Sequence, residues 1–145
     1  MYRHLLIATD GSELADKAVT QGLALAKALG AKVTGVTVTE PLVSLVAGDA
    51  SVVLPVQDYE RAAAAQAARI LDRVTTAAKT TGVPCEVVHV KEQFPAEGIG
   101  ETAHARGADL IVMASHGRRG LSKLLLGSET TKVLSQTSIP VLVCR

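Results

Sequence analysis

Residues 110–117 read LIVMASHG, and Gly127 and Ser128 follow after nine further residues. The apolar residues at the start of this stretch are typical of a buried strand. Glycines and small hydroxyl residues behind a strand leave backbone N–H groups accessible to a ligand. Residues 129–134 contain no helix breaker, so we expect a helix that opens at Gly127 and Ser128, with Ser128 as its N-cap. Because a helix N-terminus carries unpaired N–H groups and partial positive charge, the stretch predicts a phosphate site.

Two commoner phosphate-binding motifs do not match this chain. A P-loop requires Gly, four residues and then Gly-Lys-Ser/Thr, and a dinucleotide-binding loop requires GxGxxG after the first strand. The first apolar run, at 4–8, instead ends in TDGS at 9–12. Taken one by one, Gly117, Gly120 and Gly127 also suit an ordinary loop with a helix cap. A nucleotide site and a plain loop both remain open from these residues alone.

The rest of the chain repeats a pattern of apolar strand, polar turn, helix and closing glycine. We expect strands at 4–8, 32–38, 86–90, 109–114 and 141–145, and helices at 12–30, from about 58 to 82, 95–107 and from 127 onward. Strands that alternate with helices predict a parallel sheet covered on both faces. Right-handed crossovers then give a doubly wound α/β fold. At 145 residues, we expect one domain, 1–145.

Composition narrows the classes of function. Hydrophobic residues make up 48% of the chain, which is enough for a packed core, and charged residues make up 20%. Aromatic residues are only 2% and the net charge is +1, so we expect no nucleic-acid partner. The sequence has no run of eighteen apolar residues, so we expect no membrane insertion and a cytoplasmic location. The two cysteines, Cys85 and Cys144, are expected to be buried free thiols.

Several segments together resemble the universal stress protein family over essentially the whole chain. They are residues 5–12, 107–113, 115–121, 124–128 and 139–143. The ATP-binding branch of that family carries Gly, two residues, Gly, nine residues, Gly and then Ser or Thr. Gly117, Gly127 and Ser128 match this pattern, whereas Ala114 stands where the first glycine belongs. Because Ala114 directly extends a strand, we expect its backbone to be one that alanine adopts without strain, so that nucleotide binding is retained.

The resemblance implies a fold like that of the adenine nucleotide alpha hydrolases, with five parallel strands in the order 3-2-1-4-5. This order places the topological switch point between the first and fourth strands. Open α/β sheets bind ligands at such a point. Asp10 and Ala114 end these two strands, so the fold rule and the motif predict the same crevice.

The resemblance implies a nucleotide site built from both loops and the second strand. It assigns Asp10 to the ribose hydroxyls, although an Asp before Gly also caps its own turn. Val38 and Met113 would flank adenine, or be core residues only. His116 would contact the ligand or order its loop, because no orienting carboxylate for a general base is visible. The predicted nucleotide-binding residues are Ala8, Thr9, Asp10, Val38, Met113, Ala114, His116, Gly117, Arg118, Arg119, Gly127, Ser128, Glu129 and Thr130.

Arg118, Arg119 and Lys123 form a basic cluster that either neutralises phosphates or is a solvated face. The resemblance implies ATP, or ADP or AMP, with Mg²⁺ held through the phosphates. It implies a regulatory or sensor role in the stress response, with an unidentified regulatory protein partner and slow or absent hydrolysis. No catalytic residue and no protein ligand to a metal are assigned.

Two other functions stay open. One is a protein-interaction module of the same fold that binds no nucleotide, which Ala114 favours. The other is an enzyme, but residues 9–12 lack the SGGxDS-like loop of adenylating enzymes and the DxD of phosphoaspartyl enzymes.

Two segments suggest further contacts. The last strand is apolar and would lie at a sheet edge, which predicts a homodimer of C₂ symmetry. The irregular residues 39–57 are expected to cover the sheet edge or the ligand, to meet a partner, or to form a local helical turn.

Overall fold

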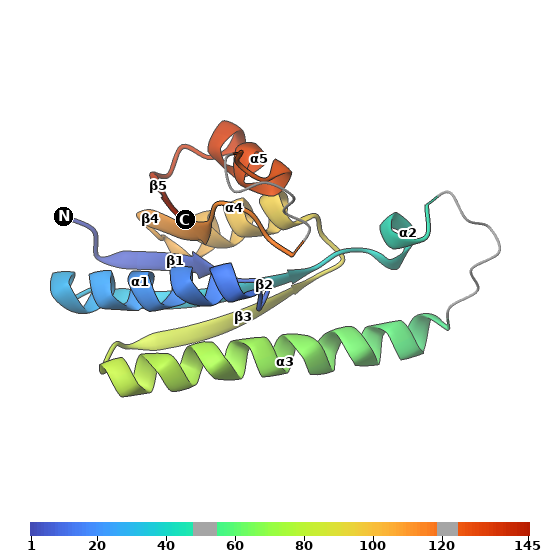
Figure 1. Ribbon diagram of the computed structural model, residues 1–145, viewed down its shortest axis with the longest axis horizontal. Helices are drawn as coiled ribbons and strands as arrows, with labels where there is room; N and C mark the ends of the chain where they lie inside the picture. The colour runs from blue at the N-terminus through green and yellow to red at the C-terminus, as the bar shows by residue number, and fades with distance from the viewer. Residues whose placement is uncertain (48–54, 119–124) are drawn as a thin grey trace.

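The computed structural model describes residues 1–47, 55–118 and 125–145, and within them five parallel strands form one sheet (Figure 1). The strands are β1 (His4–Ala8), β2 (Lys32–Thr39), β3 (Cys85–Lys91), β4 (Leu110–Ala114) and β5 (Val141–Cys144). Their order across the sheet is β3-β2-β1-β4-β5. The predicted doubly wound sheet and its strand order are confirmed.

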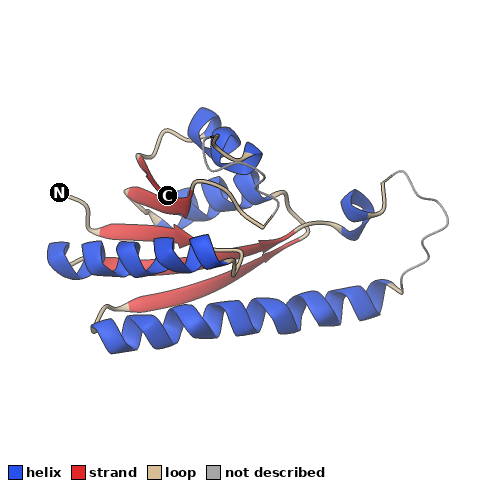
Figure 2. Ribbon diagram, viewed as in Figure 1, coloured by secondary structure: helices blue, strands red, loops and turns tan. Residues whose placement is uncertain are grey.

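Helices cover both faces of the sheet (Figure 2). On one face, α1 (Glu13–Leu29) and α3 (Val56–Thr81) pack against alternate residues of the strands, such as Ile7 and Val112. On the other face, α4 (Pro95–Arg106) and α5 (Ser128–Gln136) pack against the intervening residues, such as Leu6 and Ile111. Because both faces are covered, every residue of β1 and β4 is buried, as expected for central strands of a parallel sheet.

Local sequence explains where the helices begin and end. The Ser12 hydroxyl caps α1 by accepting a hydrogen bond from the Ala15 N–H at 3.3 Å. Gly30, Gly82 and Gly107 close α1, α3 and α4 in the left-handed conformation, which glycine adopts without a steric penalty. Helix α3 begins at Val56, two residues before the start expected near residue 58.

The site is positioned by the way the chain leaves β1 and β4. Residues Leu5 to Ile7 of β1 pair in parallel with Leu110 to Val112 of β4, so both strands end at the same edge of the sheet. From β1 the chain crosses to β2 on one side, and from β4 it crosses to β5 on the other. A crevice forms where the connections diverge in this way. The loops that follow β1 and β4 therefore flank the switch point.

The segment after β2 contains a single helical turn, α2 (Leu42–Leu45). The Tyr59 hydroxyl of α3 donates a hydrogen bond to the Glu40 carbonyl at 2.6 Å and ties this segment to the start of the long helix. Val43 is 72% exposed, so α2 leaves apolar surface uncovered. This part of the segment matches the local helical turn named among the expectations; residues 48–54 lie outside the described residues. In the described ranges, no helix combines the length and the apolar character needed to cross a membrane.

Candidate functional site

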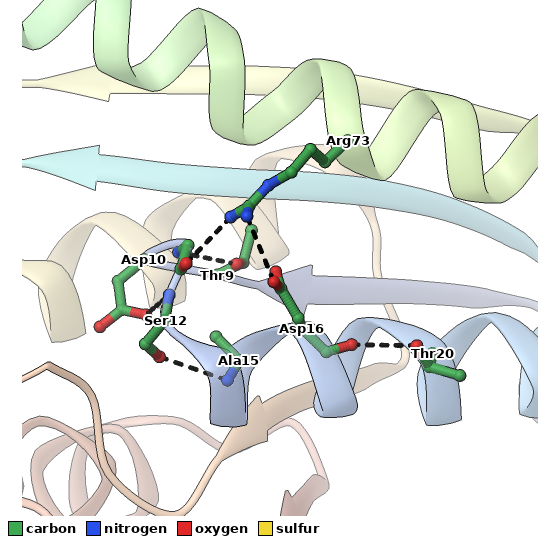
Figure 3. A network of polar contacts seen from close by, with 8 residues as sticks. Thr9, Asp10, Ser12, Ala15, Asp16, Thr20 and Arg73 are labelled. Carbon is green, nitrogen blue, oxygen red and sulfur yellow. Dashed lines mark hydrogen bonds and ion pairs between the residues drawn. The ribbon is translucent and has the colours of Figure 1, made fainter.

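The loop after β1 is turned by its own side chains (Figure 3). The Thr9 N–H donates to the Val36 carbonyl of β2 at 2.9 Å, and the Thr9 hydroxyl accepts from the Gly11 N–H at 3.1 Å. Gly11 has a φ of +76°, which explains a glycine directly after Asp10. The Asp10 Oδ1 accepts a hydrogen bond from the Ser12 N–H at 2.9 Å. One carboxylate oxygen therefore makes the turn contact expected of Asp before Gly.

The other oxygen of Asp10 joins this loop to the loop after β4. Asp10 Oδ2 accepts a hydrogen bond from the Arg118 N–H at 2.9 Å. A Cβ atom on Gly117 would lie only 2.5 Å from the same oxygen, so glycine is required at 117 for this approach. The structure thus brings Asp10, Gly117 and Arg118 together at the switch point.

Buried polar contacts hold the start of α5 against the end of β4. The Ser115 N–H donates to the Cys144 carbonyl of β5, and the Ser115 carbonyl accepts from the Gly127 N–H, each at 2.7 Å. The Thr130 hydroxyl lies 3.0 Å from the Ala114 carbonyl and 3.1 Å from the Ser115 carbonyl. Thr130 is 1% exposed, so these contacts are shielded from water. The Thr130 side chain therefore binds the backbone at the end of β4, while the Thr130 backbone belongs to the first turn of α5.

The backbone at Ala114 and Gly127 explains which residue each position accepts. Ala114 ends β4, and in the described ranges Glu92 is the sole non-glycine residue with positive φ. Alanine at 114 is therefore unstrained, as expected. A Cβ atom on Gly127 would lie 3.0 Å from the His116 Cα and 3.3 Å from the Ser115 carbonyl oxygen. Glycine at 127 allows the helix start to approach the loop this closely.

The prediction that Ser128 caps α5 is wrong. Gly127 occupies the N-cap position with φ −63° and ψ 156°, and among the described residues no side chain makes a cap hydrogen bond there. The Gly127 carbonyl already accepts from the Thr131 N–H at 3.0 Å, so Ser128 stands one residue inside the helix. Within the part of the chain that the structure describes, the first N–H groups of α5 therefore have no capping side chain. Unpaired N–H groups at a helix N-terminus are suited to binding an anion.

The hydrogen bonds of the Glu129 and His116 side chains indicate structural roles. Glu129 Oε2 accepts a hydrogen bond from the Ala96 N–H at 2.9 Å and so caps the start of α4, while Oε1 pairs with the Lys132 ammonium at 3.1 Å. His116 is half-buried, and its Nδ1 lies 3.2 Å from the Ser115 hydroxyl, a contact that orders the loop. Ser128 is exposed at the start of α5.

Val38 and Met113, the residues predicted to flank adenine, lie on the same face of the sheet but are not next to each other. Met113 is buried in β4, and Val38 is half-buried at the end of β2, next to Gly98 of α4. Ala8 of β1 lies in the strand between them. Arg118 is exposed, whereas Arg119 and Lys123 lie outside the described residues. In the part of the chain described, no group of three His, Cys, Asp or Glu side chains could hold a metal ion.

Sequence reasoning missed Ser115 and the contribution of α3. The Arg73 Nη2 donates to the Gly11 carbonyl at 2.9 Å, and Nη1 pairs with Asp16 of α1 at 3.3 Å (Figure 3). Gln66, about two turns earlier on the same face of α3, contacts the guanidinium of Arg118. The spacing of 66, 70 and 73 places three side chains on one stripe of the helix, but the sequence does not show which loops this stripe faces.

The family model of the universal stress proteins matches residues 1–145, the whole chain. The universal stress protein encoded in the QAH/OAS sulfhydrylase 3′ region of Thermus aquaticus is 33% identical over 145 residues, with 100% of both chains covered. The universal stress protein YxiE of Bacillus subtilis is 30% identical over 149 residues, again with 100% of both covered.

Solved structures agree with the fold. Protein MJ0577 of Methanocaldococcus jannaschii superposes with a TM-score of 0.79 at 26% identity, covering 99% of this chain and 96% of that one. A universal stress protein in complex with cAMP gives a TM-score of 0.71 at 24% identity, covering 99% and 97%. A universal stress protein of Archaeoglobus fulgidus in complex with dAMP gives 0.72 at 18% identity, covering 99% and 98%.

Proposed function

Because the chain belongs to the universal stress protein family, we propose that it binds an adenine nucleotide at the carboxyl edge of the sheet, between β1 and β4. The observation that carries the proposal is the start of α5. Its glycine N-cap is held against the end of β4 by the Gly127–Ser115 hydrogen bond. The loop that joins β4 to α5 also contacts the Asp10 carboxylate, through the Arg118 N–H. A helix N-terminus without a capping side chain suits a phosphate group. The cAMP and dAMP complexes of proteins with the same fold support the adenine nucleotide class.

The proposal assigns the phosphates to backbone N–H groups at Gly117 and at the first turn of α5, Ser128–Thr130. Arg118 supplies positive charge from the neighbouring loop, and we assign the same role to Arg119. Asp10 binds the ribose hydroxyls, since a carboxylate oxygen that accepts one hydrogen bond retains a second acceptor site.

The adenine end of the ligand would lie toward β2. In this assignment, backbone groups at Ala8 and Thr9 contact the nucleoside, while Val38 and Met113 provide apolar contacts to the base. Mg²⁺ would accompany the nucleotide through its phosphate oxygens, as the family resemblance implies.

At the level of the cell, we propose a regulatory or sensor module in the stress response, located in the cytoplasm, that passes nucleotide occupancy to a protein partner. ATP is the preferred candidate among the adenine nucleotides. The alternative of a module that binds no nucleotide drew its support from Ala114. The strand backbone at Ala114, which alanine adopts without strain, supports the nucleotide-binding proposal instead.

Mass spectrometry and calorimetry test the proposal together. Protein purified without added nucleotide is denatured, and the released small molecules are identified. Nucleotide-free protein is then titrated with ATP, ADP, AMP and, as a control for base recognition, GTP. We expect one adenine nucleotide per chain and weaker binding of GTP. Absence of a co-purified nucleotide together with no binding heat for any adenine nucleotide would overturn the proposal.

A further inference from the structure

Helix α3 contacts both loops of the crevice through one stripe of side chains. Arg73 donates a hydrogen bond to the Gly11 carbonyl in the loop after β1. Ile70, one turn earlier, lies against Gly11, where an added Cβ would come within 2.7 Å of the Ile70 Cγ1. Gln66, a further turn earlier, reaches Arg118 in the loop after β4. Residues spaced four and three apart lie on one face of a helix, so α3 connects the two loops.

Among the described residues, Arg118 is contacted by Asp10 and by Gln66. Its N–H donates to Asp10 Oδ2 at 2.9 Å. Its guanidinium donates to the side-chain amide oxygen of Gln66, with Nη1 at 2.5 Å and Nη2 at 2.7 Å. The amide oxygen must face Arg118, because the opposite orientation would place N–H donors against N–H donors. The Arg118 side chain therefore extends from the β4–α5 loop to α3.

The chemistry of this contact makes it exchangeable. Gln66 is neutral, so its hydrogen bonds with the guanidinium are charge-assisted from one side only. In a contact between arginine and phosphate, both partners are charged. Arginine also binds a phosphate through two parallel hydrogen bonds. Arg118 is exposed, so its guanidinium can change partner without opening the core. A phosphate placed at the start of α5 is expected to win the competition with Gln66.

We propose that Gln66 is a positioning residue that holds the Arg118 guanidinium on α3, and that the phosphates of a bound nucleotide take Arg118 from it. The inference rests on the proposed function. If the phosphates take Arg118 from Gln66, the contact between α3 and the β4–α5 loop depends on the phosphates and not on the nucleoside. The amino-terminal turns of α3 extend past the ends of β2 and β3 (Figure 1). Phosphate occupancy would thus change a contact of a helix that extends past the sheet.

Substitutions of Gln66 should change affinity in opposite directions. Gln66→Glu creates an ion pair with Arg118 that the phosphates must break, and we expect ATP to bind about three- to fivefold more weakly. Gln66→Ala removes the competing acceptor, and we expect ATP to bind about twofold more tightly. Adenosine, which has no phosphate, should bind the wild type and both variants equally. Calorimetry at low ionic strength measures all six affinities, after circular dichroism has shown that the variants are folded.

Two controls separate the contact from general electrostatics. Ala65→Glu adds the same charge at an exposed neighbouring position of α3, and we expect it to weaken ATP binding by less than about twofold. In an Arg118→Gln background, Gln66→Glu and Ala65→Glu should have equal effects. A wild type that binds neither ATP nor adenosine would overturn the proposed function, and with it this inference. A wild type that binds ATP while Gln66→Glu and Ala65→Glu weaken it equally would overturn the inference alone.

Discussion

The carboxylate of Asp10 contacts both loops of the crevice, through the N–H of Ser12 on one oxygen and that of Arg118 on the other. Both contacts depend on small neighbours. Gly117 allows Arg118 to approach Asp10, and Gly11 supplies the positive φ of the turn. Two glycines that lie far apart in the sequence therefore allow the hydrogen bonds of one carboxylate, for different physical reasons.

Gly127→Val tests the close approach of α5 to its loop. The valine Cβ would lie 3.0 Å from the His116 Cα, and an overpacked contact with backbone costs about 1–3 kcal/mol of unfolding free energy. We expect a folded protein of lower melting temperature that has lost nucleotide binding, because the loop and the helix start are pushed apart. Calorimetry and thermal unfolding measure the two effects. Gly100→Val is the matched control, since among the described residues nothing lies within 4 Å of a Cβ at Gly100. Unchanged ATP affinity in Gly127→Val would contradict the assignment of the phosphate site.

Ala114→Gly separates stability from binding at the position where the family motif has glycine. Ala114 is buried in β4 with strand backbone, so glycine removes a buried methyl group and adds unfolded-state freedom. We expect a loss of about 1 kcal/mol in unfolding free energy and an unchanged ATP affinity. Urea unfolding and calorimetry on the same preparation measure both. A clear loss of affinity would show that the Ala114 side chain itself supports the ligand.

His4 should make stability depend on pH. It is buried at the start of β1, where its Nε2 lies 2.8 Å from the Thr34 hydroxyl, which in turn donates to Glu86 at 3.0 Å. Burial, reinforced by the positive charge of Lys32, lowers the pKa of His4 below its ordinary value of 6.5. Below pH 6.5 the unfolded chain therefore binds protons that the folded chain does not. The free energy of unfolding should fall as the pH decreases from 6.5 and level off below the folded pKa.

Urea unfolding between pH 5 and 8 measures this dependence. His4→Gln should flatten the curve below pH 6.5, although burial also lowers the pKa of His89, which contributes in the same direction. His89→Gln should therefore remove a second, separate part of the slope. A His4→Gln variant with the full pH dependence of the wild type would contradict the role of His4.

At the scale of elements, the sequence predicted what local patterns determine. The apolar runs of β1 and β4 and the closing glycines of α1, α3 and α4 follow from burial and from left-handed backbone. The switch point required the strand order, which the family resemblance supplied. The start of α5 was misplaced by one residue, because the approach of Gly127 to His116 decides it and that contact is tertiary.

The contributions of α3 could not be predicted in the same way. Gln66 stands in an alanine-rich helix, and nothing in its neighbours shows that Arg118 lies within reach. The partners lie far apart in the sequence, at positions 66 and 118, so their contact exists only after β4 has been placed beside β1. Side chains that serve a site from a neighbouring helix are found from distances, not from motifs.

Arg73→Met tests how α3 supports the loop after β1. The substitution removes the hydrogen bond to the Gly11 carbonyl and the ion pair with Asp16 but keeps most of the apolar side chain. Because Arg73 is half-exposed, we expect a loss of less than about 1 kcal/mol in global stability. Hydrogen exchange at residues 9–12 should nevertheless accelerate, since the loop loses its contact with α3. Arg69→Met, at an exposed position one turn earlier, is the control. Equal exchange in the two variants would show that the turn is held by its own side chains.

At the scale of the whole molecule, the two edges of the sheet differ. β3 presents the charged, exposed residues Glu86 and Lys91, which discourage pairing with another chain. β5 is short and apolar, and its Leu142 is 39% exposed. The carbonyls of Pro140 and Cys144 accept hydrogen bonds from β4 and its following residue, so the peptide groups of Val143 face away from β4. An unpaired apolar edge of this kind is a template for a second copy of the chain.

We therefore predict a homodimer of C₂ symmetry through β5. Val143→Pro removes the outward N–H that an antiparallel partner strand would bind, and Leu142→Lys places a charge on the same edge. Light scattering at about 10 μM should give twice the 15.0 kDa chain mass for the wild type and a monomer for both variants, provided circular dichroism shows them folded. Both variants should retain nucleotide affinity, because β5 contributes no residue to the proposed site. A monomeric wild type would exclude the dimer. Variants that dimerise as tightly as the wild type would place the interface on another surface.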